Sequence, residues 1–460
     1  MFSASPHPAA PLPASRRVAV VGAGPAGLFA LQALAGSGQV PAVDVFDLLP
    51  APYGLVRYGV APDHVKTKSV IRVFERELQR PGVRFFGNVR FGVDLHRADL
   101  RRHYDAVVYA TGARDDRELG LPGEHLPGSH GGAEFVSWYS GHPDAADRRF
   151  ALATDAAVVI GAGNVALDLV RILAKAGRDL EGTDMPPEVL AALGSSTITD
   201  LHLLARRAPE YAKFSPVELR ELGGLADVQV VVDPADLPAD DEAAAAAGRD
   251  AGHNLRTLRA WAAEPGPPRP RRIHLHFGAA PRRILGERRV TGIAVRRTGR
   301  DGGVTERVLP AGLVLRAIGY RAQELPGLPF DHDGAVIPNL AGRILDAGVP
   351  QPGEYVAGWL KRGPSGVIGT NRADAVETVG SLLADLPVLP AGQGDTSAIP
   401  RLLRDRGVEV VTWEGWKRLE AQEAAGGEAR GCAAVKVNDW DALLAASRGG
   451  ADEPARIAAR

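Results

Sequence analysis

The segment RVAVVGAGPAGLFALQALAGSG, residues 17–38, decides the fold of this chain. Its first five residues predict a short buried strand, and the glycine-rich turn after them runs directly into an apolar helix. In such a turn the first glycine permits a tight bend, the second lets a pyrophosphate approach the backbone, and the third lets helix and strand pack closely. Unpaired N–H groups at the start of the helix attract the anion. The residues expected to bind a dinucleotide here are Gly22, Gly24, Pro25, Ala26 and Gly27.

A second predicted strand, residues 42–47, follows this helix and ends in Asp47. Strand, glycine turn, helix and strand together make a βαβ unit with a parallel sheet. An acid about 20 residues after the turn can hold the ribose hydroxyls of a dinucleotide. The alternative is a glycine turn with an incidental surface aspartate.

The same unit recurs in the middle of the chain. Residues 157–160 predict a strand, GAGNVA at 161–166 is a second glycine turn, and residues 201–205 predict the next strand. That strand is followed by Arg206 and Arg207 instead of an acid. Two guanidinium groups match a phosphate, which an acid would repel, so the second site is expected to take NADP(H) and not NAD(H). The alternative is a solvated basic pair at a strand end.

Two dinucleotide sites in one chain predict two cofactors that face each other. The first turn suits FAD and the second suits NADPH, whose hydride would pass to the flavin. Residues 105–112 and 312–319 each predict a buried strand that delivers the chain from one domain to the other. The expected fold class is therefore α/β, with two Rossmann-like dinucleotide-binding domains, the FAD domain being discontinuous. The expected parts are a disordered lead-in at 1–16, an FAD domain at 17–115 and 325–460 with a C-terminal extension, and an NADP domain at 116–324.

A third glycine-rich segment, YVAGWLKRGPSGVIGTNRADA, spans residues 355–375. A strand is expected to end at Gly358, and residues 366–370 are expected to open a helix. Backbone N–H groups there could stabilise negative charge on a reduced flavin ring, against which Trp359 could lie. The alternative is an ordinary Gly-Pro loop with a core tryptophan.

Composition excludes several other classes of protein. Lys and Arg number 54 against 55 Asp and Glu, so the formal charge of −1 argues against a nucleic-acid binder. Cys432 is the only cysteine, which excludes an intramolecular disulfide, a CxxC centre and an iron–sulfur cluster held by this chain alone. The opening MFSASPHPAAPLPAS lacks the cationic start and apolar run of a signal peptide, and no apolar stretch reaches the roughly 18 residues of a membrane span. We expect a cytoplasmic protein without a membrane span, and no metal site.

Several longer motifs resemble one family of flavoenzymes. YGLVRYGVAPDHVKTKS at 53–69, ARRAPEYAKFSPVELREL at 205–222 and GWLKRGPSGVIGTN at 358–371 resemble the adrenodoxin-reductase-type ferredoxin–NADP reductases, and their bacterial members most. The similarity runs from about residue 17 to the C-terminal helices. It implies a glutathione-reductase-like fold of two domains, tightly but not covalently bound FAD, and delivery of single electrons to ferredoxin-type iron–sulfur proteins.

The resemblance also implies roles for individual residues. Asp47 matches the acid on the FAD ribose, and Glu218 matches a carboxylate near the nicotinamide amide. The other residues that it assigns to FAD are Leu55, Val89, Trp359, Gly366, Val367 and Ile368, of which Gly366 also lies beside the nicotinamide. The residues that it assigns to NADP are the turn Gly163, Asn164 and Val165, the 2′-phosphate clamp Arg206 and Arg207, and Arg117.

The expected catalytic residues are His64, Glu218 and Asp168, with Asp168 as a charge partner of His64. The alternatives are a turn residue for His64 and acids that favour helix starts for the other two. APEYAKF, which follows Arg206, departs from the family's GPLQAAF-like stretch: Glu210 and Lys213 make this loop more charged.

An acidic ferredoxin-type partner is expected to dock on Arg256 and Arg259, which lie three apart on a predicted helix. The alternative is a solvated basic face. The expected oligomeric state is a monomer. Among rival functions, the lack of CxxC argues against a disulfide oxidoreductase of this fold. Another NADPH-dependent flavin oxidoreductase, including a monooxygenase, and an NADP-binding flavoprotein subunit of a larger complex stay open.

Overall fold

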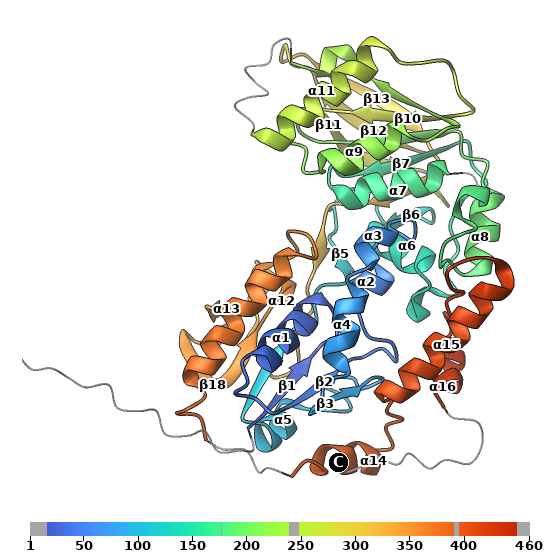
Figure 1. Ribbon diagram of the computed structural model, residues 1–460. Coiled ribbons are helices and arrows are strands. Elements are labelled where there is room, and N and C mark those ends of the chain that lie inside the picture. The colour runs from blue at the N-terminus through green and yellow to red at the C-terminus, as the bar shows by residue number, and fades with distance from the viewer. Residues whose placement is uncertain (1–15, 176, 239–247, 391–394, 449–460) are drawn as a thin grey trace, which may run out of the picture.

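A computed structural model of the chain describes residues 16–175, 177–238, 248–390 and 395–448 (Figure 1). Residues 1–15 of the lead-in expected at 1–16 lie outside the described residues. Arg16, which we expected at the end of that lead-in, is instead buried, and its guanidinium lies 2.7 Å from the carboxylate of Asp105. Arg16 therefore belongs to the first domain.

The first domain is built on a seven-stranded sheet in the order β16-β17-β18-β4-β1-β2-β3. Its strands from β18 to β3 are parallel, and β16 and β17 add antiparallel strands at one edge. In β1 the residues Val18 and Val20 enter one core and Ala19 and Val21 another, as expected of a strand covered on both faces. The strands are β1 (Arg17–Val21), β2 (Ala42–Phe46), β3 (Val83–Phe86), β4 (Ala106–Tyr109), β16 (Asn339–Leu340), β17 (Arg343–Asp346) and β18 (Val349–Val356).

Helices cover both faces of this sheet. α1 and α13 pack side by side, with α4 next to α1 (Figure 1). The helices of this domain are α1 (Pro25–Gly36), α2 (Leu55–Tyr58), α3 (Val65–Lys68), α4 (Ile71–Leu78), α5 (Arg97–His103), α12 (Trp359–Arg362), α13 (Thr370–Asp385), α14 (Ala398–Asp405), α15 (Trp413–Arg430) and α16 (Trp440–Ser447). Trp416 and Leu443 of the last two helices belong to the same core as α1, so the C-terminal extension is part of this domain.

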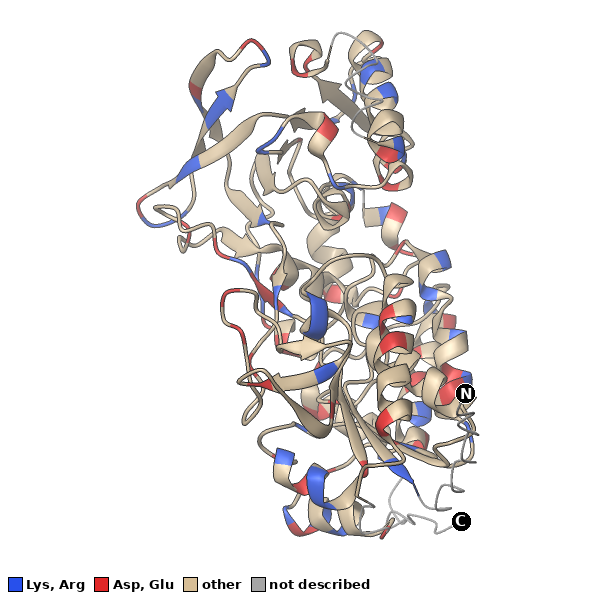
Figure 2. Ribbon diagram, turned by 90° about the vertical axis from the view of Figure 1, so that its left-hand side faces the viewer, with Lys and Arg blue, Asp and Glu red and all other residues tan. Residues whose placement is uncertain are grey.

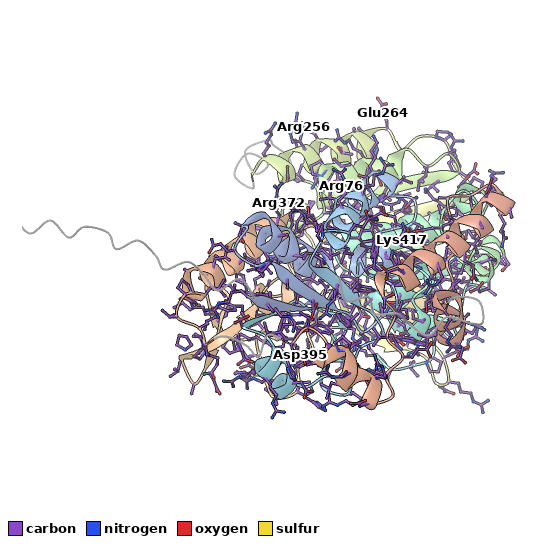
Figure 3. All side chains as sticks on the ribbon, turned by 60° about the horizontal axis from the view of Figure 1, so that its bottom comes forward. Arg76, Arg256, Glu264, Arg372, Asp395 and Lys417 are labelled. Carbon is purple, nitrogen blue, oxygen red and sulfur yellow. The ribbon has the colours of Figure 1, made fainter. Side chains whose placement is uncertain are left out.

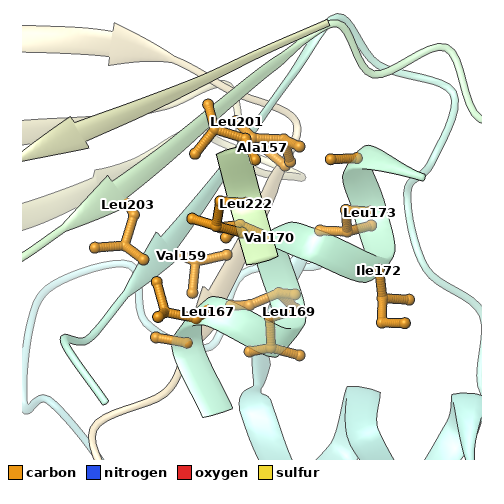
Figure 4. Packing of buried hydrophobic residues seen from close by; sticks show 14 of the residues in the cluster. Ala157, Val159, Leu167, Leu169, Val170, Ile172, Leu173, Leu201, Leu203 and Leu222 are labelled. Carbon is orange, nitrogen blue, oxygen red and sulfur yellow. The ribbon is translucent and has the colours of Figure 1, made fainter. Parts of the chain in front are cut away.

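The second domain is built on a parallel sheet in the order β6-β14-β7-β8-β10-β9, next to a three-stranded antiparallel sheet β11-β12-β13. The apolar side of α7 packs on Val159 and Leu203 of the parallel sheet, with Leu222 of α9 beside it (Figure 4). The strands are β6 (Ser129–Gly131), β7 (Ala156–Ile160), β8 (Asp200–Leu204), β9 (Val228–Val232), β10 (Arg271–His276), β11 (Ala279–Leu285), β12 (Gly292–Thr298), β13 (Val304–Pro310) and β14 (Leu313–Arg316). The helices are α6 (Gly132–Tyr139), α7 (Asn164–Ala174), α8 (Pro187–Gly194), α9 (Pro216–Gly223) and α11 (Arg249–Ala263), with 3-10 turns at Pro143–Ala145, Gly177–Leu180, Pro209–Tyr211 and Pro234–Asp236.

The chain crosses between the two domains twice, after β4 and after β14. The crossings run side by side as β5 (Asp115–Asp116) and β15 (Tyr320–Arg321), which pair antiparallel. The strands expected at 105–112 and 312–319 are thus confirmed as β4 and β14. The expected α/β fold of two Rossmann-like domains, the first of them discontinuous, is also confirmed.

Charged residues of both signs are interspersed over both domains (Figure 2). Within the part of the chain that the structure describes, no helix combines the length and the apolar character needed to cross a membrane.

Three histidines stack on the side of the parallel sheet that faces β13. The ring of His202 on β8 lies 4.7 Å from that of His274 and 5.3 Å from that of His276, both on β10. Arg307 of β13 donates to Nδ1 of His276 at 2.8 Å, and the Nε2 of His276 lies 3.0 Å from Nδ1 of His202. Burial lowers the pKa of His202 to about 4 and, with the nearby His202, that of His276 to about 3. Both rings are therefore neutral at physiological pH.

We expect this stack to make the protein acid-sensitive. The unfolded chain takes up protons on these histidines near their ordinary pKa of 6.5, whereas the folded chain resists until about pH 4, so stability falls as pH drops through this window. His276→Gln keeps one acceptor and one donor but does not titrate. Urea unfolding at pH 7 and pH 5 should show a smaller acid loss in this variant than in the parent. His125→Gln, at an exposed histidine, should lose as much as the parent; equal losses in all three proteins would contradict the assignment.

Candidate active site

The first glycine turn has a backbone that only glycine can adopt at its critical places. Gly22 has φ +112°, and a Cβ there would lie 2.4 Å from the carbonyl oxygen of Ala110. A Cβ at Gly27 would lie 1.9 Å from the carbonyl oxygen of Gly22. α1 then begins at Pro25, and no side chain of the described residues caps it. The N–H groups at its start are therefore open to an anion, which fits the pyrophosphate of a dinucleotide.

Asp47 lies where a ribose acid is expected and is held by the backbone. Its two carboxylate oxygens accept hydrogen bonds from the N–H groups of Ala23 at 2.6 Å and Leu49 at 2.9 Å. Burial raises the pKa of Asp47 to about 6, although both amides and the charge of Arg114 oppose this. Each oxygen keeps a second lone pair, so the side chain can still accept from ribose hydroxyls.

The remaining residues expected at the flavin lie on short loops around this turn. Leu55 opens α2, and the N–H of Val89 donates to the carbonyl of Asp47 at 2.9 Å. The ring of Trp359 packs against Tyr320 of β15, with 5.4 Å between centroids. The loop expected at the flavin ring, Gly366, Val367 and Ile368, directly precedes α13, which begins at Thr370 without a side-chain cap from the described residues.

The second glycine turn forms a similar cradle. A Cβ built on Gly163 meets no described atom within 4 Å, so the space above this turn is open. α7 begins at Asn164, and no described side chain caps it. The side chain of Asn164 instead accepts from the N–H of Ser215 at 2.8 Å and ties the turn to the loop before α9. Val165, on the first turn of α7, is partly buried against the cores of both domains.

Arg206 and Arg207 directly follow β8 and are both exposed. Among the residues that the structure describes, neither forms an ion pair, and the guanidinium of Arg207 lies 5.6 Å from the ring centroid of Tyr211. Glu210, which makes this loop more charged than the corresponding stretch of the family, is paired with Arg300 at 3.1 Å. The two arginines thus remain available to a phosphate.

His64 lies between α2 and α3 of the first domain, and its side chain contacts Glu221 of the second domain. Its Nε2 lies 2.9 Å from Glu221, 3.4 Å from Glu218 and 3.9 Å from Asp168. The three expected catalytic residues are therefore brought together. Glu218 also stands at the start of α9, where its N–H donates to Ser215 at 3.2 Å, so the helix-start role coexists with proximity to His64.

Arg171 is the centre of this cluster, and the sequence did not single it out. Its guanidinium binds both oxygens of Asp63 at 2.9 and 3.0 Å, Asp168 at 2.7 Å and Glu221 at 2.9 Å. Asp168, expected to pair with His64, is thus closer to Arg171. The signal for it was present, because residues three apart share a helix face: Asp168 and Arg171 on α7. Glu218 and Glu221 on α9 have the same spacing.

The cluster contains two cations, Arg171 and Lys175, together with His64. Its four carboxylates belong to Asp63, Asp168, Glu218 and Glu221. Although burial raises the pKa of Asp63, the hydrogen bonds and charges of Arg171 and Lys175 lower it to about 2. Burial instead raises the pKa of Asp168 to about 6, and it raises that of Glu218. Ligand atoms of His64, Asp168 and Glu218 lie within 4.8 Å of one another, as a metal would require, but Arg171 already supplies a cation there. The carboxyl of Asp168 can therefore hold or release a proton near neutral pH between the two domains.

Other expected site residues lie further out. Arg117 is exposed in the link between the domains, where its Nε donates to the carbonyl of Tyr320 at 3.1 Å. Arg256 of α11 is exposed and lies 2.9 Å from His253. Arg259 is only partly exposed and donates to the carbonyl of Pro238 at 3.0 Å. Of the two arginines expected at a docking face, Arg256 is thus the more accessible.

Comparison with known proteins agrees with this geometry. A family model for pyridine nucleotide-disulphide oxidoreductases matches residues 16–205. The NADPH-ferredoxin reductase FprA of Mycobacterium leprae is 41% identical over 94% of this chain and 98% of its own. The mitochondrial NADPH:adrenodoxin oxidoreductase of Arabidopsis thaliana is 38% identical over 94% and 95%. The structure of Mycobacterium tuberculosis FprA in complex with NADPH has a TM-score of 0.89 at 40% identity, covering 94% of this chain and all of that one.

The two glycine cradles and these matches define an FAD- and NADP-binding oxidoreductase of the two-domain flavoprotein class. Its single cysteine cannot form an intramolecular disulphide, although the description of the matching family model includes disulphide oxidoreductases. The identity over nearly the whole of both chains goes further: the chain belongs to the NADPH–ferredoxin reductase family.

Proposed function

We propose that this chain is an FAD-dependent ferredoxin–NADP⁺ reductase, which passes a hydride from NADPH to FAD and then single electrons to a ferredoxin-type iron–sulfur protein. The observation that carries the proposal is the pair of glycine turns whose helices no described side chain caps. Only the second is followed, after its next strand, by two exposed arginines that form no ion pair with any described residue. The flavin, when bound, supplies the change from two-electron to one-electron chemistry. The residues of the chain bind and orient the two cofactors and provide the charges around them.

In this proposal the first domain, 17–115 and 325–460, holds FAD, and the second, 116–324, holds NADP(H). Asp47 holds the FAD ribose, and the start of α1 faces the pyrophosphate. The start of α13, after the loop at Gly366, lies where negative charge on the flavin would be stabilised. Asn164 starts the helix that faces the NADP pyrophosphate.

The cluster around His64 would act at the boundary between the two cofactors. Burial raises the pKa of Asp168 to about 6, so this carboxyl can keep or release a proton near neutral pH, and burial also raises the pKa of Glu218. Arg171 holds both helices of the second domain against Asp63, the residue next to His64. We therefore assign His64, Glu218 and Asp168 to proton handling and orientation, and Arg171 to fixing their positions.

The first test is the absorption spectrum of the purified protein. It should be yellow, release FAD on denaturation, and bleach anaerobically when NADPH is added. NADPH-dependent reduction of a ferredoxin by the isolated chain should follow at many turnovers per flavin, which separates an enzyme from a binding subunit. A colourless protein that cannot be reconstituted with FAD would contradict the proposal.

The partner is proposed to be acidic and to dock where Arg256 is exposed; the protein is proposed to be a cytoplasmic monomer. Arg256→Glu should raise the apparent KM for ferredoxin roughly threefold to tenfold at low salt, because reversing the charge weakens steering. The difference should shrink as salt rises. Ferredoxin-dependent cytochrome c reduction measures this, and ferricyanide reduction should not change. Arg101→Glu on α5, on the other domain, is the matched control. Equal effects of both variants would place the docking site elsewhere.

A further inference from the structure

The C-terminal segment of residues 413–447, which we call the C-terminal strap, comprises α15, a loop and α16. It runs along the outside of the first domain and reaches the second domain near α8 (Figure 1). On the first domain Trp416 of α15 packs edge-on against Tyr53, with 5.8 Å between ring centroids. Leu419 is fully buried in the same core. The strap is thus fixed to the first domain by apolar packing.

Lys436, in the loop of the strap, joins both domains. Its side chain is only 2% exposed. Its ammonium group donates to the carbonyl of Arg57 in the first domain at 2.8 Å, and in the second domain to the carbonyl of Ser140 at 3.1 Å. The carboxylate of Asp184, also in the second domain, lies 3.1 Å away. The three protons of one ammonium group therefore have three acceptors, contributed by two domains.

Asp184 receives a second cation from the first domain. Lys68 of α3 lies 2.8 Å from both of its oxygens. Although burial raises the pKa of Asp184, the charges of Lys436 and Lys68 hold it well below its ordinary value. Burial and the charge of Lys68 lower the pKa of Lys436 to about 7, so keeping an amine here is costly. Because burying the amine of Lys436 costs free energy, and because all three of its protons have acceptors, we infer that Lys436 has a specific role beyond packing.

The loop that carries Lys436 is itself fixed to α2. Glu423 of α15 accepts from the guanidinium of Arg57 at 2.5 Å and from the N–H of Val437 at 2.9 Å. Both charged side chains are buried. Next to the loop, Trp440 donates to Asp144 at 2.8 Å, and Asn438 donates to Glu188. These last two contacts add a second, more exposed attachment to the second domain.

The strap and Asp184 together hold both ends of the segment that carries His64. Arg57 precedes Asp63 and His64 in the chain, and Lys68 follows them. Lys436 holds the carbonyl of Arg57, and Asp184 holds Lys68. We propose that Lys436 is a positioning residue that sets the angle between the two domains, and with it the place of His64 against α7 and α9. Only the kinetic part of the test below rests on the proposed function.

The test uses the full-length protein with FAD and a Lys436→Met variant, which keeps the length of the side chain but not its donors. Cys432→Ser removes the native thiol, and spin labels on cysteines at Arg76 and Glu264 report the distance between the domains (Figure 3). Both positions are exposed, Arg76 on α4 and Glu264 after α11. We expect the distance distribution of Lys436→Met to shift or broaden by roughly 2 Å or more. This measurement needs neither nucleotide nor ferredoxin, so it stands even if the proposed function is wrong.

The second readout is the rate of flavin reduction by NADPH in a single turnover. It should fall roughly tenfold or more, because small misplacements of reacting groups are costly. The FAD content and the dependence of this rate on NADPH concentration should stay near the parent values. Lys417→Met is the matched control, since Lys417 lies in the same strap, on α15, and its ammonium group pairs with Glu75 within the first domain (Figure 3). It should match the parent in both readouts.

A Lys436→Met protein with the parent's distance distribution would overturn the proposal. If this variant does not retain FAD, Asp184→Asn decides, because it leaves the packing of the strap unchanged and removes the carboxylate that Lys436 and Lys68 share. A shifted or broadened distribution in Asp184→Asn supports the proposal, and a parent-like distribution overturns it.

Discussion

Replacing Arg171 by leucine is expected to lower the free energy of unfolding by about 3–5 kcal/mol, the largest loss that we foresee for a single substitution. The side chain is 2% exposed and is surrounded by Asp63, Asp168 and Glu221. Without the guanidinium, Lys175 is the one lysine or arginine among the described residues that still pairs with these carboxylates, so buried negative charge is left uncompensated. Urea denaturation at pH 7, followed by far-UV circular dichroism, measures the loss.

The loss should depend on pH in a definite direction. Arg171 and Lys175 depress the pKa of Asp63 from 3.8 to about 2, so the pair stabilises the fold above pH 4 and this contribution fades as pH falls toward 2. The difference between parent and Arg171→Leu should therefore be largest at neutral pH and shrink below pH 4. Arg178→Leu is the control, because Arg178 is 71% exposed and its pair with Asp227 is worth about 1 kcal/mol or less. Equal losses in the two variants would show that the cluster around Arg171 does not hold the domains together.

The sequence predicted what is encoded locally. A side chain at Gly22 or Gly27 would clash with the backbone, so the glycine pattern of the first turn can be recognised from the sequence alone. The role expected for Arg206 and Arg207 was also predicted locally, because both residues follow the second predicted strand of the second glycine-turn unit. Strands β4 and β14 were found because short apolar runs that lead into small residues are typical of buried parallel strands.

The contacts between the two domains could not be predicted from the sequence. Arg171 meets Asp63 only because of the angle between the domains, and no local pattern encodes that angle. Lys436 is separated from Arg57 by most of the chain, so neither residue reveals the other. The acids around His64 depend on helix placement in the same way: Asp168 lies 3.9 Å from its Nε2, as expected of a charge partner, but Glu221, which the sequence did not single out, lies nearer at 2.9 Å. The spacing of Glu218 and Glu221 was visible, and reading it as one helix face would have found Glu221.

Replacing both Arg206 and Arg207 by alanine is expected to raise the apparent KM for NADPH by roughly tenfold or more. A charge-assisted hydrogen bond contributes about 1.5–3 kcal/mol, and two exposed guanidinium groups without acidic partners are placed to give such bonds to a 2′-phosphate. NADH has no such phosphate, so its use should stay nearly unchanged. The maximal rate with NADPH should change little, because a clamp far from the hydride binds ground and transition states alike. Steady-state ferricyanide reduction with each coenzyme measures both constants.

Single variants separate the two arginines, and Arg300→Ala separates the clamp from general loss of positive charge. Arg300 is paired with Glu210 in the same region, so its removal frees a carboxylate but takes away no unpaired cation. We expect Arg300→Ala to weaken NADPH binding less than either single clamp variant, and each single variant to weaken it less than the double variant. A double variant that still prefers NADPH over NADH as the parent does would show that the phosphate is held elsewhere. Arg117 and Arg114, both exposed near the link between the domains, would then be the next residues to replace.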